Sequence, residues 1–238
     1  MQGPLAGAAI LFDLDGTLID TADDLGAALN HALVSAGLPS ATFQSMRGYV
    51  GHGAAAMLAK AIRDIGVADE DVDREALLRE FLSYYEAHIA DNSRPFPGVI
   101  EAIAVLRRDG ARIAICTNKR ERFARLLIEK LSLGALFEAI VGADTASAPK
   151  PDPAPLRECL RAVSVGRGVL VGDSDTDIAA GVNAGMPVII SELGYGPLER
   201  RREAHDAFSN FEQLPRIVRQ ALSARDINLS GYPPADSR

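Results

Sequence analysis

Long hydrophobic runs and cysteine are both scarce in this chain of 238 residues. No apolar run is long enough to span a bilayer. The first run, residues 6–12, has no basic segment before it and leads directly into Asp13, which indicates a buried strand rather than a signal peptide. The two cysteines, Cys116 and Cys159, have no paired spacing, which excludes a disulfide framework and a zinc site. We therefore expect a soluble, cytoplasmic protein in a reducing compartment.

Clusters of positive charge are lacking as well. The formal net charge is −7, and the densest basic run, residues 200–202, lies between Glu199 and Glu203. Such a chain repels nucleic acids and anionic membranes, so we expect neither as a partner. An anionic substrate would need a local cation or a metal ion. The sequence leaves monomer and homodimer open.

The remaining composition is that of an ordinary globular protein, with 47% hydrophobic and 24% charged residues. From residue 95 to about residue 190, short apolar runs alternate with segments whose apolar residues have helical spacing. Besides residues 8–11 near the N-terminus, the apolar runs are residues 111–116, 139–141, 168–171 and 187–190. Strands that alternate with helices predict an α/β fold with a doubly wound, Rossmann-like parallel sheet.

A segment of different character interrupts this pattern after the first apolar run. It contains no comparable strand run, and Thr21 is a candidate N-cap for the first of its helices. Three stretches in it have helical spacing, namely residues 22–36, 53–65 and 72–90.

This change of character predicts two domains. We expect a small all-helical cap at residues 20–94, inserted into a core that is formed by residues 1–19 and 95–223. The polar residues 224–238 are expected to form a flexible tail.

Two carboxylates follow the first apolar run, in the segment Asp13-Leu14-Asp15-Gly16-Thr17-Leu18. In a parallel α/β sheet, ligands bind beyond the carboxyl ends of the strands, where this segment is expected to lie. One carboxylate could attack a phosphorus atom as a nucleophile, while the other could protonate the leaving oxygen and later deprotonate water. The alternative is a polar turn with a helix cap, since Asp and Gly are common in turns.

A second acidic segment, Gly172-Asp173-Ser174-Asp175-Thr176-Asp177, follows the apolar run at residues 168–171. Mg²⁺ in proteins is commonly held by one or two carboxylates together with substrate phosphate. Asp173 is nearest to the expected strand and is the candidate ligand, while Asp177, one helical turn further on, is a candidate for a supporting position. The alternative is an acidic helix N-terminus stabilised by the helix dipole.

Polar residues also follow the run at residues 111–116, where Thr117 and Asn118 could hydrogen-bond a phosphoryl oxygen. Lys150 lies between two prolines that restrict the backbone, so its ammonium could be directed at phosphoryl charge and at crowded carboxylates. The alternatives are a Thr/Asn helix cap and a solvated surface lysine.

These four signals occur in one order, each after a strand-like run, and together they resemble the haloacid dehalogenase-like superfamily of phosphotransferases over residues 8–220. The resemblance implies that Asp13 is the nucleophile that forms an aspartyl-phosphate and that Asp15 is the general acid and base. Thr117 and Lys150 correspond to the superfamily's motif threonine and lysine.

The resemblance also implies a Mg²⁺ ion. Its ligands would be the Asp13 side chain, the Asp15 backbone carbonyl and Asp173, with Asp177 in support. No motif in the chain departs from the superfamily's pattern.

The helical insert resembles the small cap of that superfamily, and residues 18–25, 50–53 and 96–99 resemble bacterial phosphoglycolate phosphatases. The segment Gly51-His52-Gly53 would lead into a helix N-terminus, whose free amides favour an anion. A substrate carboxylate could bind there, with Arg47 and His52 as further donors. The alternative is a flexible turn before an ordinary amphipathic helix.

The motifs and the resemblance together predict a Mg²⁺-dependent phosphatase for a small phosphate monoester, above all 2-phosphoglycolate. A phosphatase for another small ester, such as a sugar phosphate or pyrophosphate, and a phosphomutase similar to β-phosphoglucomutase remain alternatives. The chain length, the helical insert and the second carboxylate disfavour a receiver domain. A dehalogenase would need no acid at the position of Asp15.

Overall fold

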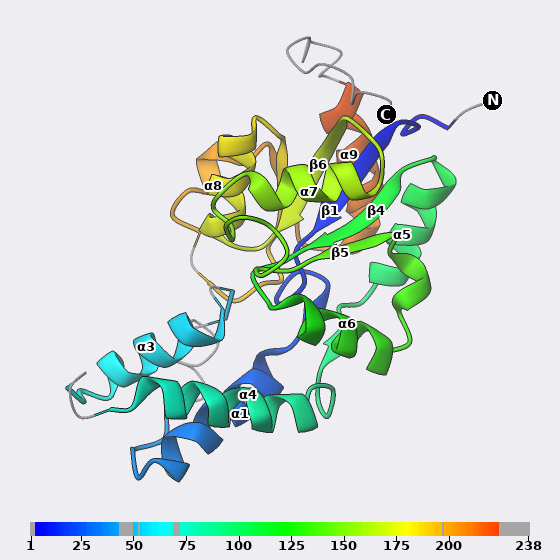
Figure 1. The fold of residues 1–238 in the computed structure, drawn as a ribbon. Helices are drawn as coiled ribbons and strands as arrows, with labels where there is room; N and C mark the ends of the chain where they lie inside the picture. The colour runs from blue at the N-terminus through cyan, green and yellow to red at the C-terminus, as the bar shows by residue number, and fades with distance from the viewer. Residues whose placement is uncertain (1–2, 43–49, 52, 69–71, 197, 224–238) are drawn as a thin grey trace, which may run out of the picture.

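The residues that the structure describes form a central sheet of six parallel strands (Figure 1). The structure is a computed structural model, and it describes residues 3–42, 50–51, 53–68, 72–196 and 198–223. The strand order is β5 (Ala139–Val141), β4 (Arg112–Cys116), β1 (Ala8–Phe12), β6 (Arg167–Gly172), β7 (Val188–Ser191), β8 (Asp206–Phe208). This confirms the expected α/β class, and the topology places β1 between β4 and β6.

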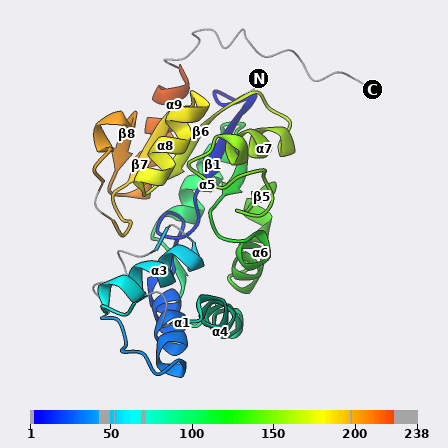
Figure 2. The same cartoon turned by 60° about the vertical axis from the view of Figure 1, so that its left-hand side comes forward.

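Helices cover both faces of the sheet because side chains along each strand alternate between two apolar cores. In β1, Ile10 and Phe12 belong to one core, while Ala9 and Leu11 belong to the other. The first core is covered by α5 (Val99–Arg108), α6 (Glu121–Lys130) and α9 (Leu214–Ser223). The second is covered by α7 (Ala154–Ala162) and α8 (Asp175–Ala184), which lie together on one face (Figures 1 and 2). The described part of the chain also contains the short 3-10 helices η2 (Gly134–Leu136), η3 (Arg201–Glu203) and η4 (Phe211–Gln213).

Three helices of the insert lie as a group beyond one end of the sheet (Figure 1). They are α1 (Ala22–Ser35), α3 (Ala54–Asp64) and α4 (Arg74–Ala87), and α4 packs against both of the others. The chain enters the insert through β2 (Ile19–Asp20) and leaves it through β3 (Arg94–Pro95), and these two short strands pair antiparallel. The expected boundaries at residues 20 and 94 fall on this pair, while the division into two domains stays a prediction.

The start of the insert differs from the expectation in one side chain. Thr21 occupies the N-cap position of α1, but its side chain makes no capping hydrogen bond. Its hydroxyl instead donates to Asp15 Oδ1 at 2.8 Å, so it belongs to the candidate site. The helix is held at Asp24, which is buried and accepts hydrogen bonds from the backbone amides of Asn92 and Ser93.

The expected tail at residues 224–238 lies outside the described residues, as do Arg47 and His52. Within the described part of the chain, no helix is long and apolar enough to cross a membrane.

Candidate active site

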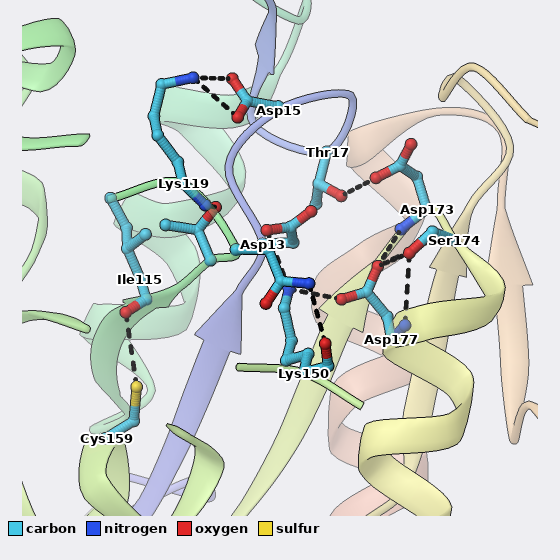
Figure 3. Close-up of polar contacts among 12 residues, drawn as sticks. Asp13, Asp15, Thr17, Ile115, Lys119, Lys150, Cys159, Asp173, Ser174 and Asp177 are labelled. Atoms are coloured by element: carbon cyan, nitrogen blue, oxygen red, sulfur yellow. Dashed lines mark hydrogen bonds and ion pairs between the residues drawn. The ribbon is translucent and has the colours of Figure 1, made fainter. Parts of the chain in front are cut away.

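Figure 3 shows five of the predicted site residues of the core gathered at the carboxyl edge of the sheet, namely Asp13, Asp15, Lys150, Asp173 and Asp177. Asp13 directly follows β1, Thr117 follows β4 and Asp173 follows β6, so three neighbouring strands end at the same place. This is the topological switch point of the sheet, because the chain continues from β1 to β4 and β5 on one side and then crosses to β6 on the other side of β1.

Lys150 bridges two carboxylates at this edge. Its Nζ lies 2.9 Å from Asp13 Oδ1 and 2.6 Å from Asp177 Oδ1, and all three side chains are almost fully buried. Burial alone lowers the pKa of Lys150, but the two carboxylates outweigh it and raise that pKa above its ordinary value. Burial also raises the pKa of Asp13 to about 6, against the opposing charge of Lys150.

Three carboxylates crowd around this one ammonium. Ligand atoms of Asp13, Asp173 and Asp177 all lie within 4.8 Å of one another. Burial, followed by the charges of Asp13 and Asp177, raises the pKa of Asp173 well above its ordinary value. None of the described cations forms an ion pair with Asp173, so the negative charge of the cluster is only partly balanced. The oxygen donors and this excess charge fit a divalent cation.

The lone pairs that remain free in the cluster differ from residue to residue. Asp177 uses both oxygens, because Oδ1 accepts from Lys150 and Oδ2 accepts from Ser174 in a capping box at the start of α8. Asp13 Oδ1 accepts no hydrogen bond from any described group, although Lys150 lies close to it. Asp173 Oδ1 accepts one hydrogen bond, from Thr17. Asp13 and Asp173 are therefore the carboxylates with capacity for a metal ion, and Asp177 orients its surroundings.

Two glycines make room for Asp173. A Cβ atom on Gly16 would lie 2.4 Å from Asp173 Oδ2, and one on Gly194 would lie 2.2 Å from the same oxygen. Gly16 also has φ = +83°, a conformation that favours glycine. Any larger residue at either position would displace the Asp173 carboxylate.

Asp15 faces away from the carboxylate cluster and toward Lys119 (Figure 3). Lys119 Nζ lies 2.8 Å from both Asp15 oxygens, and Thr21 donates a further hydrogen bond to Oδ1. Burial lowers the pKa of Lys119, but the charge of Asp15 outweighs it and raises that pKa above its ordinary value.

Lys119 is the main residue that sequence reasoning missed. It is buried and continues the segment Thr117-Asn118 after β4. The signal that could have found it is a lysine directly after a strand in a site that otherwise gathers acidic residues.

The loop after β4 is joined to the Lys150 loop. Asn118 Nδ2 donates to the backbone carbonyl of Lys150 at 2.9 Å, while Asn118 Oδ1 is buried without a hydrogen-bond partner among the described residues. Thr117 Oγ1 accepts a hydrogen bond from the amide of Lys119 at 3.2 Å, which fixes the turn from β4 into this loop.

A cavity of about 190 Å³ lies between the sheet edge and the helical insert. From the core it is lined by both motif carboxylates and by the loop after β4, including Lys119 and Arg120. From the insert it is lined mainly by apolar side chains, together with the predicted residues Gly51 and Gly53. Gly53 is the N-cap residue of α3, and a Cβ on it would lie 3.5 Å from Asn118 O, so the start of α3 lies close to the loop after β4.

Comparison with known proteins places this geometry in a family. The model of the haloacid dehalogenase-like hydrolase family matches residues 10–191. A phosphoglycolate phosphatase from Caulobacter vibrioides is 42% identical over 193 residues, which covers 80% of this chain and 81% of that protein. A phosphoglycolate phosphatase from Mesorhizobium japonicum is 42% identical over 224 residues, which covers 89% of this chain and 97% of that protein.

Solved structures have the same fold. The crystal structure of a predicted phosphoglycolate phosphatase from Haemophilus somnus is similar with a TM-score of 0.79 at 26% identity, covering 88% of this chain and 96% of that chain. CbbY from Rhodobacter sphaeroides, crystallised with phosphate, is similar with a TM-score of 0.73 at 25% identity, covering 87% of this chain and 95% of that chain.

Proposed function

The chain belongs to the haloacid dehalogenase-like hydrolase family and is a phosphoric monoester hydrolase, and from this premise we propose that it cleaves 2-phosphoglycolate to glycolate and phosphate in a Mg²⁺-dependent reaction. The observation that carries the proposal is the cavity of about 190 Å³ with Asp13 and Asp15 in its lining. It is smaller than the pockets of roughly 300–1,000 Å³ that hold drug-sized ligands, so it suits a small ester.

Asp13 is the proposed nucleophile. Its carboxylate attacks phosphorus in line with the ester oxygen, the bond from phosphorus to that oxygen breaks, and an aspartyl-phosphate forms. The Lys150 ammonium, 2.9 Å from Asp13 Oδ1, lowers the repulsion between this carboxylate and the phosphate. Water then attacks the aspartyl-phosphate, the bond between Asp13 and phosphorus breaks, and the free carboxylate returns.

Asp15 is the proposed acid and base. In its protonated form, it donates its proton to the leaving glycolate oxygen in the first step, and the carboxylate left behind takes a proton from the attacking water in the second. Before substrate binds, its two oxygens face Lys119, so an anionic substrate would compete with Asp15 for this ammonium. Thr117 and Asn118 are the proposed donors to the phosphoryl oxygens.

The proposed metal ligands are the Asp13 side chain, the Asp15 backbone carbonyl and Asp173. This choice is supported by the few hydrogen bonds that these carboxylates accept, since Asp13 Oδ1 accepts none from a described group and Asp173 Oδ1 accepts one, and by the unbalanced charge of the cluster. A bound Mg²⁺ would neutralise phosphate charge and orient the phosphoryl group. Asp177 would hold Lys150 and the loop before α8.

The position of Arg120 favours a substrate whose leaving group is anionic. It lines the cavity and forms no ion pair with any described residue, whereas Lys119 and Lys150 are both paired with carboxylates. The start of α3 at Gly53 offers free backbone amides on the opposite side. A carboxylate such as that of 2-phosphoglycolate would be attracted to both.

The test is the release of phosphate from a panel of esters, with Mg²⁺ and with EDTA. The panel contains 2-phosphoglycolate, sugar phosphates, pyrophosphate and a nucleoside monophosphate. We expect Mg²⁺-dependent release with the highest kcat/KM for 2-phosphoglycolate. A higher value for another ester would replace the proposed substrate and keep the mechanism, and phosphate release that EDTA leaves unchanged would contradict the metal requirement.

A further inference from the structure

Tyr85, on helix α4 of the insert, carries a buried phenol hydroxyl that makes no hydrogen bond of standard geometry with a described group. The residue is 2% exposed, and its Oη forms no hydrogen bond with any described group. Buried polar groups are nearly always hydrogen-bonded, because water is lost without replacement when they are not. An unpaired hydroxyl in this position therefore indicates a partner that binds from outside the chain.

The position of the ring is fixed by its neighbours. It stacks on Phe81 at 6.1 Å between centroids and meets the edge of Phe123 at 6.0 Å. Lys119 Nζ lies 4.7 Å from the centroid of the Tyr85 ring, a cation–π contact that puts the ring beside the Lys119–Asp15 ion pair. Besides burial, the charges of Lys119 and Asp15 both act on the pKa of the Tyr85 phenol, so the hydroxyl lies close to the proposed acid and base.

Tyr85 also differs in polarity from the other residues with which the insert lines the cavity. Among the described residues that line the cavity from the insert, it has the only polar side chain. The others are aliphatic or aromatic side chains and small residues, for example Leu25, Met57, Leu78 and Phe81. One hydroxyl in an apolar wall is the kind of group that fixes the orientation of a small ligand.

We propose that Tyr85 binds the leaving group of the substrate, and that its hydroxyl donates a hydrogen bond to the carboxylate of 2-phosphoglycolate. This rests on the proposed function, which it deepens by naming a residue of the insert that selects for an oxygen on the leaving group. Burial raises the pKa of Tyr85 to about 12, so the phenol remains a donor at neutral pH. The insert then contributes directly to substrate choice.

The test removes this hydroxyl alone, in Tyr85→Phe, and compares two substrates. A hydrogen bond to a charged group contributes enough that we expect kcat/KM for 2-phosphoglycolate to fall by roughly 10- to 100-fold. Ethyl phosphate has no further oxygen on its leaving group, so its kcat/KM should stay within about twofold. Because the hydroxyl has no partner in the free protein, the melting temperature should stay equal or rise.

Tyr84→Phe is the matched control. Its ring stacks between His31 and His88, at 4.2 Å between ring centroids in each case, and lies outside the cavity lining. Removal of its hydroxyl should therefore leave kcat/KM unchanged for both substrates. An equal loss for both substrates in Tyr85→Phe, or no loss for either, would overturn the role of Tyr85. If the wild-type enzyme prefers another ester with an oxygen on its leaving group, the proposed substrate is wrong, and that ester then replaces 2-phosphoglycolate in the same comparison with ethyl phosphate.

Discussion

At the scale of single residues, the site gathers charges that have been removed from water. Asp13, Asp173 and Asp177 lie within 4.8 Å of one another, and Lys150 pairs with only two of them. Burying an unbalanced carboxylate costs free energy, and such costs concentrate where a protein performs chemistry. The folded chain therefore carries at this sheet edge a destabilising charge that a bound cation would offset.

The substitution Asp173→Asn tests whether the buried charge of Asp173 destabilises the folded protein. The pKa of Asp173 is raised in the folded protein, chiefly by burial, so the folded state holds its proton more tightly than the unfolded state does. Asp173 therefore costs the wild-type protein stability as pH rises above the ordinary pKa of 3.8, and this contribution is absent from the asparagine variant. In EDTA at pH 8, we therefore expect the variant to have a higher free energy of unfolding than the wild-type protein, measured by urea unfolding.

The same measurement at other conditions supplies the controls. The stability difference between Asp173→Asn and wild type should narrow as pH is lowered toward 4, because wild-type Asp173 then takes up its proton. Added Mg²⁺ should stabilise the wild-type protein more than the variant. A variant that is less stable than wild type in EDTA at pH 8 would show that Asp173 is not a strained charge.

Several of these residues could be predicted from the sequence because each follows a strand-like run. Asp13, Asp173 and Lys150 meet as expected, since the topology of a parallel sheet brings the strand ends together. Lys119 could not be paired with Asp15, because 104 residues separate them and no local pattern encodes the contact. Tyr85 has helical spacing with its apolar neighbours, so the sequence pattern alone indicates a residue of the cap core rather than a contact to substrate.

At the scale of elements, two short strands connect the insert to the sheet. β2 and β3 pair antiparallel, and Asp24 at the start of α1 accepts hydrogen bonds from the segment just before β3. The two passages of the chain are thereby tied together at the boundary of the insert. The position of the cavity wall depends on this connection, because α1 and α4 continue from it.

Asp24→Ala should weaken this connection. The substitution leaves the buried amide and hydroxyl of Ser93 and the amide of Asn92 without their acceptor. We expect the free energy of unfolding to fall by about 2–4 kcal/mol, which lowers the melting temperature measured by calorimetry by roughly 4–16 °C. Asp23→Ala is the control, because its side chain is exposed on the neighbouring position and should change the melting temperature little. Equal melting temperatures for both variants would contradict the structural role of Asp24.

The elements that sequence reasoning missed are the shortest ones. β2 and β3 have two residues each, which is too short for a hydrophobic period to be recognised. β8 is as long as β5, but its sequence Asp-Ala-Phe begins with a charged residue and so is not an apolar run like that of β5. Their pairing is decided by contacts between distant parts of the chain. The expected helix at residues 72–90 is shorter in the structure, where α4 begins after Asp73, which accepts a capping hydrogen bond from Ala76 N.

At the scale of the whole molecule, an acidic chain encloses a small cavity with a local set of cations. The net charge of −7 repels an anionic ester, yet Lys119, Lys150 and Arg120 are placed at or beside the cavity. The sheet supplies the groups proposed to act on phosphorus, while the insert supplies an apolar wall with Tyr85. The proposed chemistry belongs to the core, and the proposed substrate choice belongs to the insert.

The central claim is that Asp13 becomes phosphorylated during turnover. Its most direct test is a rapid acid quench of the enzyme with Mg²⁺ and 2-phosphoglycolate that carries a radiolabelled phosphoryl group, followed by peptide mapping. We predict label on Asp13 within the first turnover, and neither label nor turnover in Asp13→Asn, which should keep its fold by circular dichroism. Phosphate release at the wild-type rate from Asp13→Asn, or label on a different residue, would contradict the account.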